Sequence, residues 1–132
     1  MIGIVIVAHG GLAREYLAAV EHVVGRQNGI RAIPIEADCD RELKQSEICA
    51  AADSVDSGHG VVVVTDMFGG SPSNLSLRAC EPSNRQILYG ANLPMLIKLA
   101  KSRHLSVPDA VQGSLAAGRK YIDSFSGPAA AQ

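Results

Sequence analysis

Four consecutive valines, Val61 to Val64, constrain the fold of this chain more than any other feature of its sequence. A run of β-branched residues is typical of a β-strand. Because side chains alternate between the two faces of a sheet, an unbroken apolar run must be buried on both faces. Such strands belong to parallel sheets that helices cover on both sides. The sequence therefore predicts an α/β protein in which residues 61–65 form a central strand.

Further apolar segments of strand length alternate with longer segments of helical periodicity. We expect strands at residues 2–8, 30–35, 61–65 and 86–89. We expect helices at residues 12–25, from Asp38 or Asp40 to about 55, from Ser71 onward, at about 93–102 and at 107–125. This alternation predicts an open parallel sheet of order 2-1-3-4 with helices on both faces, which is a flavodoxin-like fold. We expect one domain over residues 1–126 and a disordered tail at 127–132.

Apolar residues at helical spacing predict the buried face of each helix. For the first two helices the expected inward-facing residues are Leu12, Tyr16, Ala19, Val20, Val23 and Val24, and then Leu43, Ile48, Ala51, Ala52 and Val55.

A histidine and an aspartate follow the two central strands of this predicted sheet. His9 comes directly after the first strand, and Asp66 comes directly after the third. Ligands of open α/β sheets bind beyond the carboxyl ends of the strands, where the strand order reverses. Adjacent strands lie about 4.8 Å apart, so the two side chains can touch. A carboxylate that accepts a hydrogen bond from one ring nitrogen leaves the other nitrogen free as a nucleophile.

Glycines beside this pair predict a place for an anion. Gly69, Gly70 and Ser71 lead into one predicted helix, and Gly10 leads into another. Free backbone N–H groups at such helix starts favour phosphate. These features predict phosphoryl transfer at His9 and Asp66 without a metal ion or a cofactor. Residues 90–95 follow the fourth strand, and we expect them to form the far wall of the site.

The same edge of the sheet carries apolar residues that are suited to docking another protein. We expect an apolar lip made of Met67, Phe68, Leu93 and Met95.

The charge pattern excludes several other classes of function. The formal net charge is −1, and acidic and basic residues are mixed along the chain. There is no basic stripe for a nucleic acid and no basic amphipathic helix for a membrane surface. The apolar start of the chain lacks a preceding basic region, and His9 interrupts it, so we interpret it as a buried strand and expect a cytoplasmic protein. The odd number of cysteines, three, without a CxxC pair argues against a disulfide framework and a zinc site.

Three other chemistries fit the residues less well. A receiver domain phosphorylated on Asp66 needs an acidic pair after the first strand to hold Mg²⁺, and His9 and Gly10 stand there instead. A hydrolase with a triad of Ser71, His9 and Asp66 needs the motif G-x-S-x-G, which Ser73 breaks. A dinucleotide-binding module needs the spacing G-x-G-x-x-G, which residues 8–13 lack.

Three motifs resemble the IIA proteins of the mannose family of the bacterial phosphoenolpyruvate-dependent sugar phosphotransferase system. They are residues 8–10 (AHG), residues 64–74 (VTDMFGGSPSN) and residues 90–95 (GANLPM). The resemblance covers about residues 2–125.

The resemblance implies roles for single residues. His9 matches the position that accepts phosphate from the carrier protein HPr, and Asp66 matches the carboxylate that orients it. Ser71, with the turn at 69–74, matches the segment that holds the phosphate and lines the docking surface. Asn92 lies in the matching third loop, which makes it a further candidate for phosphate binding or docking.

The resemblance also implies partners. Members are commonly dimers, and in transport the phosphate passes to a IIB domain and then to sugar. Some members exchange a C-terminal strand between subunits, but no fifth strand is evident after residues 107–125. Without a fused IIB domain, we expect either a separate IIB partner or a purely regulatory role, in which the charge on His9 controls the binding of another protein.

Overall fold

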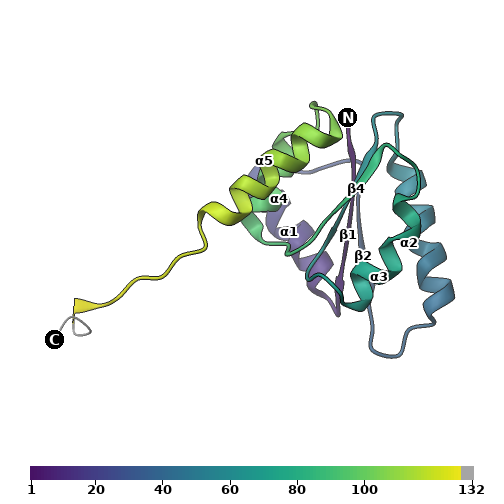
Figure 1. The fold of residues 1–132 in the computed structure, drawn as a ribbon, viewed down its shortest axis with the longest axis horizontal. Coiled ribbons are helices and arrows are strands. Elements are labelled where there is room, and N and C mark those ends of the chain that lie inside the picture. Colours follow the sequence, from purple (N-terminus) through teal and green to yellow (C-terminus); the bar gives the residue numbers. More distant parts are fainter. Residues whose placement is uncertain (129–132) are drawn as a thin grey trace.

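The computed structural model describes residues 1–128. Its centre is a parallel sheet made of β1 (Gly3–His9), β2 (Ile30–Ile35), β3 (Val61–Thr65) and β4 (Arg85–Leu88). The strands have the order β2-β1-β3-β4, which places β1 and β3 in the middle. Figure 1 shows the sheet between two layers of helices. The predicted α/β fold and strand order are therefore confirmed.

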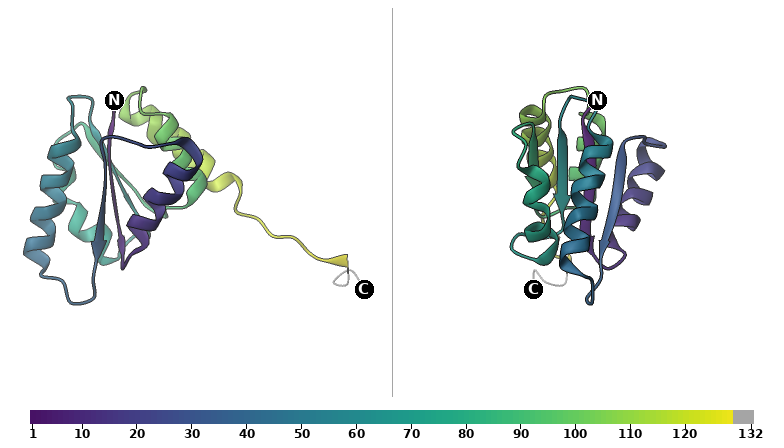
Figure 2. Two further views of the ribbon diagram at one scale, coloured as in Figure 1. Left: turned by 180° about the vertical axis from the view of Figure 1, so that it is seen from behind. Right: turned by 90° about the vertical axis from the view of Figure 1, so that its right-hand side faces the viewer.

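Helices cover both faces of the sheet (Figure 2). One face carries α1 (Leu12–Val24), α4 (Leu93–Lys101) and α5 (Val107–Lys120). The other carries α2 (Arg41–Val55), α3 (Ser71–Ser76) and the short 3₁₀ helix η1 (Arg78–Cys80). Val62 and Val64 pack on the first side, and Val61 and Val63 pack on the second. This division explains why β3 tolerates no polar residue before its last position, since both of its faces are core.

The helices are short compared with a membrane span. The bilayer core requires about 20 apolar residues in helical form. No helix in residues 1–128 has the length and hydropathy needed to cross a membrane.

The last helix is shorter than the periodicity predicts. α5 ends at Lys120, and residues 122–127 have no regular secondary structure, where a helix to residue 125 was expected. Figure 1 shows this segment extending away from the body of the protein. Ile122 and Phe125 are 75% and 89% exposed. Most helical stability in proteins comes from tertiary packing. Because these side chains do not pack on the sheet or its helices, they do not stabilise a continuation of α5. Of the predicted tail, residues 129–132 lie outside the described part of the chain.

Three residues expected in the core are exposed. Leu12 and Val23 are 39% and 53% exposed, because the buried side of α1 is centred on Ala13 and Val20. One position along a helix is a rotation of about 100°, so a small error in phase moves a side chain into solvent. Leu43 is 70% exposed, because it lies in the first turn of α2, whose buried residues begin at Ile48.

Candidate functional site

The sheet brings His9 and Asp66 together at its carboxyl edge. His9 is the last residue of β1, and Asp66 follows β3, whose Thr65 pairs with Val7. Nδ1 of His9 lies 2.7 Å from Oδ2 of Asp66, although the two residues are 57 positions apart in sequence. The backbone N–H of His9 donates to the same oxygen at 3.0 Å. The carboxylate is thus held to β1 by two contacts and fixes the orientation of the ring.

Asp66 is the sheltered partner and His9 is the accessible one. The side chain of Asp66 is 12% exposed and that of His9 is 49% exposed. Partial burial acts to raise the pKa of the Asp66 carboxyl, but hydrogen bonds from the His9 backbone and ring, with the charge of that ring, outweigh it. The pKa of Asp66 therefore lies below its ordinary value. An ionised carboxylate only accepts hydrogen bonds, so Nδ1 carries the proton and Nε2 is left with its lone pair.

The second oxygen of Asp66 is also in use. Oδ1 accepts a hydrogen bond from the backbone N–H of Met67 at 3.0 Å. Both carboxylate oxygens therefore accept hydrogen bonds: Oδ2 connects the end of β3 to the end of β1, and Oδ1 holds the local turn after β3.

The turn at Gly69 and Gly70 fits closely against the histidine ring. A Cβ atom at Gly70 would lie 3.2 Å from Cε1 of His9, which is closer than side chains normally pack. Gly69 has φ of +83°, a conformation that glycine adopts without strain. Its N–H donates to Oγ of Ser73, whose hydroxyl in turn donates to the carbonyl of Gly70. The two glycines thus shape the turn on which the ring lies.

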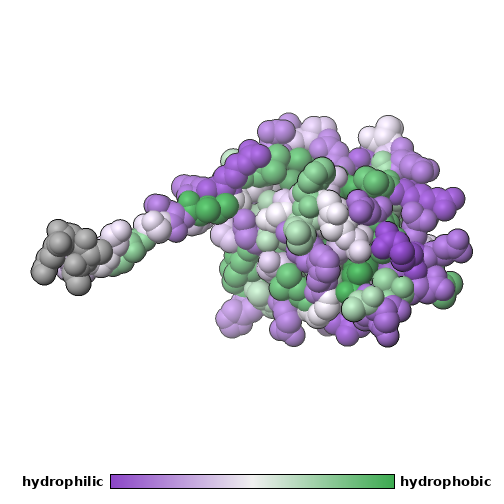
Figure 3. Space-filling view, turned by 60° about the horizontal axis from the view of Figure 1, so that its bottom comes forward, coloured by the Kyte–Doolittle hydropathy of each residue, from purple (hydrophilic) through white to green (hydrophobic). Residues whose placement is uncertain are grey.

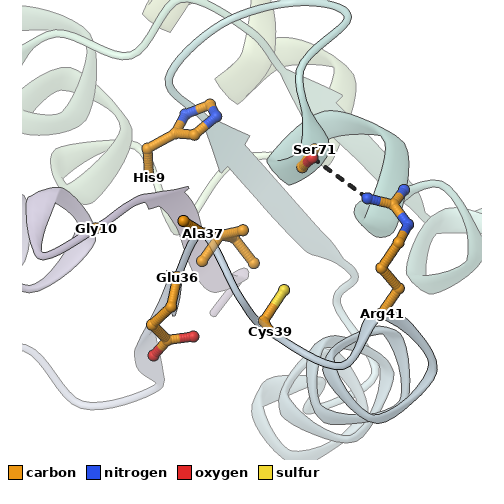
Figure 4. Close-up of a pocket in the computed structure, with 8 residues that line it drawn as sticks. His9, Gly10, Glu36, Ala37, Cys39, Arg41 and Ser71 are labelled. Atoms are coloured by element: carbon orange, nitrogen blue, oxygen red, sulfur yellow. Dashed lines mark hydrogen bonds between the residues drawn. The ribbon is translucent and has the colours of Figure 1, made fainter.

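A cavity of about 410 Å³ opens beside His9 (Figure 4). It is lined by His9, Gly10, Ile35, Glu36, Ala37, Cys39, Arg41 and Ser71. Three of the residues predicted for the site, His9, Gly10 and Ser71, therefore meet at one cavity. The backbone N–H of Gly10 is already bonded to the carbonyl of Ile35, so Gly10 contributes shape and not a free donor. Ser71 is the first residue of α3 and its side chain does not cap the helix; Gly70 occupies the cap position.

One wall of this cavity was not anticipated from the sequence. It is made of Glu36, Ala37 and Cys39, which lie between β2 and α2, and of Arg41, the first residue of α2. Nη1 of Arg41 lies 3.3 Å from Oγ of Ser71. The signal that could have found this wall is the strand order, because it places the end of β2 beside the end of β1, where Ile35 pairs with His9.

Asn92 does not line the cavity. Its side-chain oxygen accepts the N–H of Met95 and so caps α4, and its amide nitrogen donates to the carbonyl of Gly118 at 3.1 Å. A role in docking stays a prediction. Tyr16 supports the same loop by donating to the carbonyl of Ala91 at 3.0 Å. Burial, and then the charge of Asp66, raise the pKa of Tyr16, so its hydroxyl remains a donor.

Only part of the predicted apolar lip reaches the surface. Met67 and Phe68 are 54% and 76% exposed, and Phe68 packs edge-on against Tyr89 with 5.0 Å between ring centroids. Met95 is 4% exposed and belongs to the core, and Leu93 is half-buried against it, so neither forms a lip. Figure 3 turns this end of the molecule toward the reader and shows hydrophobic side chains at the surface among hydrophilic ones.

The fold and the site define a class of protein: a flavodoxin-like domain with a histidine that a carboxylate orients at the carboxyl edge of the sheet. The sequence model of the family described as "PTS system fructose IIA component" matches residues 3–114. The chain belongs to this family of IIA components of the sugar phosphotransferase system, and the resemblance drawn from its motifs is confirmed.

Relatives and solved structures agree with this assignment. The chain is 28% identical over 127 residues to the mannose-specific EIIAB component of Escherichia coli. The aligned region covers 94% of this chain but only 39% of that longer protein. It is 30% identical over 104 residues to the putative phosphotransferase enzyme IIA component YadI of Escherichia coli, covering 78% of the chain and 71% of that protein. The crystal structure of phosphotransferase component EIIA from Streptococcus agalactiae superposes with a TM-score of 0.79 at 28% identity, over 95% of this chain and 98% of that one.

Proposed function

We propose that this chain is a cytoplasmic phosphoryl carrier that accepts a phosphoryl group from phospho-HPr on Nε2 of His9. The observation that carries the proposal is the 2.7 Å contact between Nδ1 of His9 and Oδ2 of Asp66. This contact uses one ring nitrogen for orientation and leaves the other for reaction, on a side chain that is 49% exposed. The group then passes to a separate IIB protein for sugar uptake, or its presence signals the phosphorylation state of the system.

The transfer needs no group beyond those of the two proteins. The lone pair of Nε2 attacks the phosphorus, and the bond between that phosphorus and the donor's histidine nitrogen breaks, with its electron pair returning to the donor ring. Positive charge develops on the His9 ring, and Asp66 stabilises it through Nδ1. The hydroxyl of Ser71 lines the cavity where the phosphoryl oxygens would lie. The same steps in reverse order release the group to an acceptor.

Asp66 is a poor candidate for the phosphorylated residue itself. Its two oxygens accept three hydrogen bonds from the His9 backbone, the His9 ring and the Met67 backbone. Forming an acyl phosphate would break at least one of them. This favours the histidine carrier over a receiver-like domain.

The chemistry of the phosphorylated product tests the proposal. The protein is incubated with labelled phosphoenolpyruvate, enzyme I and HPr, and the product is exposed separately to acid, base and hydroxylamine. We expect a label that acid removes and base preserves, because phosphohistidine has a P–N bond. A label that base and hydroxylamine both remove and that His9→Ala retains would indicate an acyl phosphate on Asp66 and contradict the proposal. Omitting HPr is the control, and it should leave the protein unlabelled.

We also propose that the chain forms a homodimer. The extended residues after α5 support this, because Tyr121, Ile122 and Phe125 are 65%, 75% and 89% exposed. Apolar side chains gathered on one exposed segment are typical of a surface that binds another protein. We expect light scattering at micromolar concentration to give the mass of a dimer. Ile122→Asp with Phe125→Asp should give a monomer, whereas Val23→Asp, at an exposed apolar residue of α1, should stay dimeric. A monomeric unmodified chain would refute this.

A further inference from the structure

We propose that Arg41 is a phosphoryl-binding residue, which contacts the group on His9 together with Ser71. The inference rests on the proposed carrier function and extends it to Arg41, which lies outside the three motifs that resemble the family. Arg41 is the first residue of α2 and comes from a different segment than His9 and Ser71. All three line the same cavity, and Figure 4 shows the Arg41 guanidinium reaching to Ser71 at its rim.

Arg41 is a cation without an acidic partner. Among the described residues it has no carboxylate within 4.0 Å, and its hydrogen bond goes to the neutral hydroxyl of Ser71, 3.3 Å from Nη1. A guanidinium has five N–H donors in a planar fork that matches the oxygens of a phosphoryl group. Among the described residues no other partner of the Arg41 guanidinium is found, so its remaining donors are available to phosphoryl oxygens in the cavity that it shares with His9.

The acidic side chain of the cavity, Glu36, is ionised, and a lysine compensates its charge. Oε2 of Glu36 lies 3.4 Å from Nζ of Lys44, and a backbone hydrogen bond, with this lysine and Arg14, holds the pKa of Glu36 below its ordinary value. Figure 4 shows the Glu36 carboxylate on the far side of the cavity from Arg41. Asp40, the neighbour of Arg41, uses its side chain to cap α2 through the N–H of Leu43. Arg41 thus remains the uncompensated charge next to Ser71.

The chemistry of the carrier requires such a cation. A phosphoryl group brings nearly two negative charges to His9, whose ring already contacts the Asp66 carboxylate. The two anions repel each other across the ring, and a guanidinium on the solvent side offsets that repulsion. Charge-assisted hydrogen bonds from arginine to phosphoryl oxygens are the stronger kind and hold the group in a defined orientation.

Arg41→Gln tests this assignment, and the chain offers a matched control. Arg31 of β2 also donates to a serine hydroxyl, from Nη1 to Oγ of Ser54 at 3.4 Å, and it does not line the cavity. Arg31→Gln therefore removes the same charge and the same kind of bond elsewhere. The wild type, Arg41→Gln, Arg41→Lys and Arg31→Gln are phosphorylated with phospho-HPr, and the kcat and KM for phospho-HPr are measured. The phosphoryl pKa of each product is then measured by phosphorus NMR.

We expect Arg41→Gln to lower kcat about tenfold with little change in KM, and to raise the phosphoryl pKa, because the cation favours the dianion. Arg41→Lys should recover part of both effects, and Arg31→Gln should behave as the wild type. An unchanged kcat and phosphoryl pKa in Arg41→Gln would overturn the assignment. A raised KM alone would overturn it too, since Arg41 would then bind HPr. A wild-type chain that takes no group on His9 would refute the carrier function itself, and this assignment with it.

Discussion

His9→Ala is expected to abolish phosphorylation completely while leaving the protein folded. The imidazole supplies the only atom that bonds to phosphorus in the proposed reaction, so no residual transfer remains when it is removed. The fold should survive because the His9 side chain is 49% exposed and lies outside both hydrophobic clusters. Asp66 also keeps two of its three partners, the backbone N–H groups of His9 and Met67.

The measurement is the labelling reaction together with thermal unfolding followed by circular dichroism. His22→Ala is the matched control, because His22 is an exposed histidine in the last turn of α1, away from the cavity. It should be labelled at the wild-type rate. A labelled and folded His9→Ala protein would show that another residue accepts the phosphoryl group.

Asp66→Asn is expected to slow phosphoryl transfer by between about 10²- and 10⁴-fold without removing the acceptor. An amide has one oxygen, whereas Asp66 presents two that both accept hydrogen bonds. If the amide oxygen faces Met67, its NH₂ group faces His9 and donates to Nδ1. The ring proton then moves to Nε2, which blocks the nucleophile. If the oxygen faces His9, the tautomer is kept but the charge that stabilises the ring is lost.

The same substitution should cost about 1–3 kcal/mol of unfolding free energy, because one backbone N–H is left against an NH₂ group in either orientation. Asp56→Asn is the control that separates the loss of unfolding free energy from the loss of phosphoryl-transfer rate. Asp56 accepts from the N–H groups of Gly58 and Gly60 before β3, at the opposite end of that strand. We expect a similar loss of stability and an unchanged transfer rate for Asp56→Asn. Denaturant unfolding measures the stability, and labelling reactions stopped at timed intervals measure the transfer rate. Equal rates for Asp66→Asn and the wild type would remove Asp66 from the mechanism.

We expect the free energy of unfolding to fall in acid as the Asp66 carboxylate is protonated, which denaturant unfolding at a series of pH values measures. The pKa of Asp66 is lowered in the folded protein, so its ionisation stabilises the fold above the ordinary aspartate pKa, and this contribution is lost as pH falls through the lowered value. The His9–Asp66 contact is therefore retained throughout the neutral and mildly acidic range. Asp66→Asn removes this part of the dependence of stability on pH.

The strand pattern was enough to predict the centre of the site. The unbroken valines of β3 indicated a sheet covered on both faces, and the alternation of strands and helices indicated parallel strands, for which the order β2-β1-β3-β4 was expected and is found. That order alone brought His9 next to Asp66. The ends of neighbouring parallel strands are fixed by backbone geometry, which depends little on the identity of nearby side chains, so the strand order was enough to place this pair.

The parts that could not be predicted depend on side-chain packing. Arg41 is the first residue of α2, and its place at the cavity depends on the path of residues 36–40, which connect β2 to that helix. Ile122 and Phe125 continue the helical spacing of α5, but the sheet offers them nothing to pack against. Periodicity reports which residues could share a face, whereas the extent of the neighbouring surface decides whether they do.

The long separation between the two site residues has a consequence for newly made protein. His9 is synthesised early, but its carboxylate partner follows 57 positions later and comes into place only when β3 pairs with β1. At common rates of translation, this interval lasts roughly 3 to 11 seconds. During that time the imidazole has no partner to set its tautomer. On the proposed mechanism, an unfinished or misfolded chain therefore accepts phosphoryl groups far more slowly than a folded one, and the groups go mainly to completed molecules.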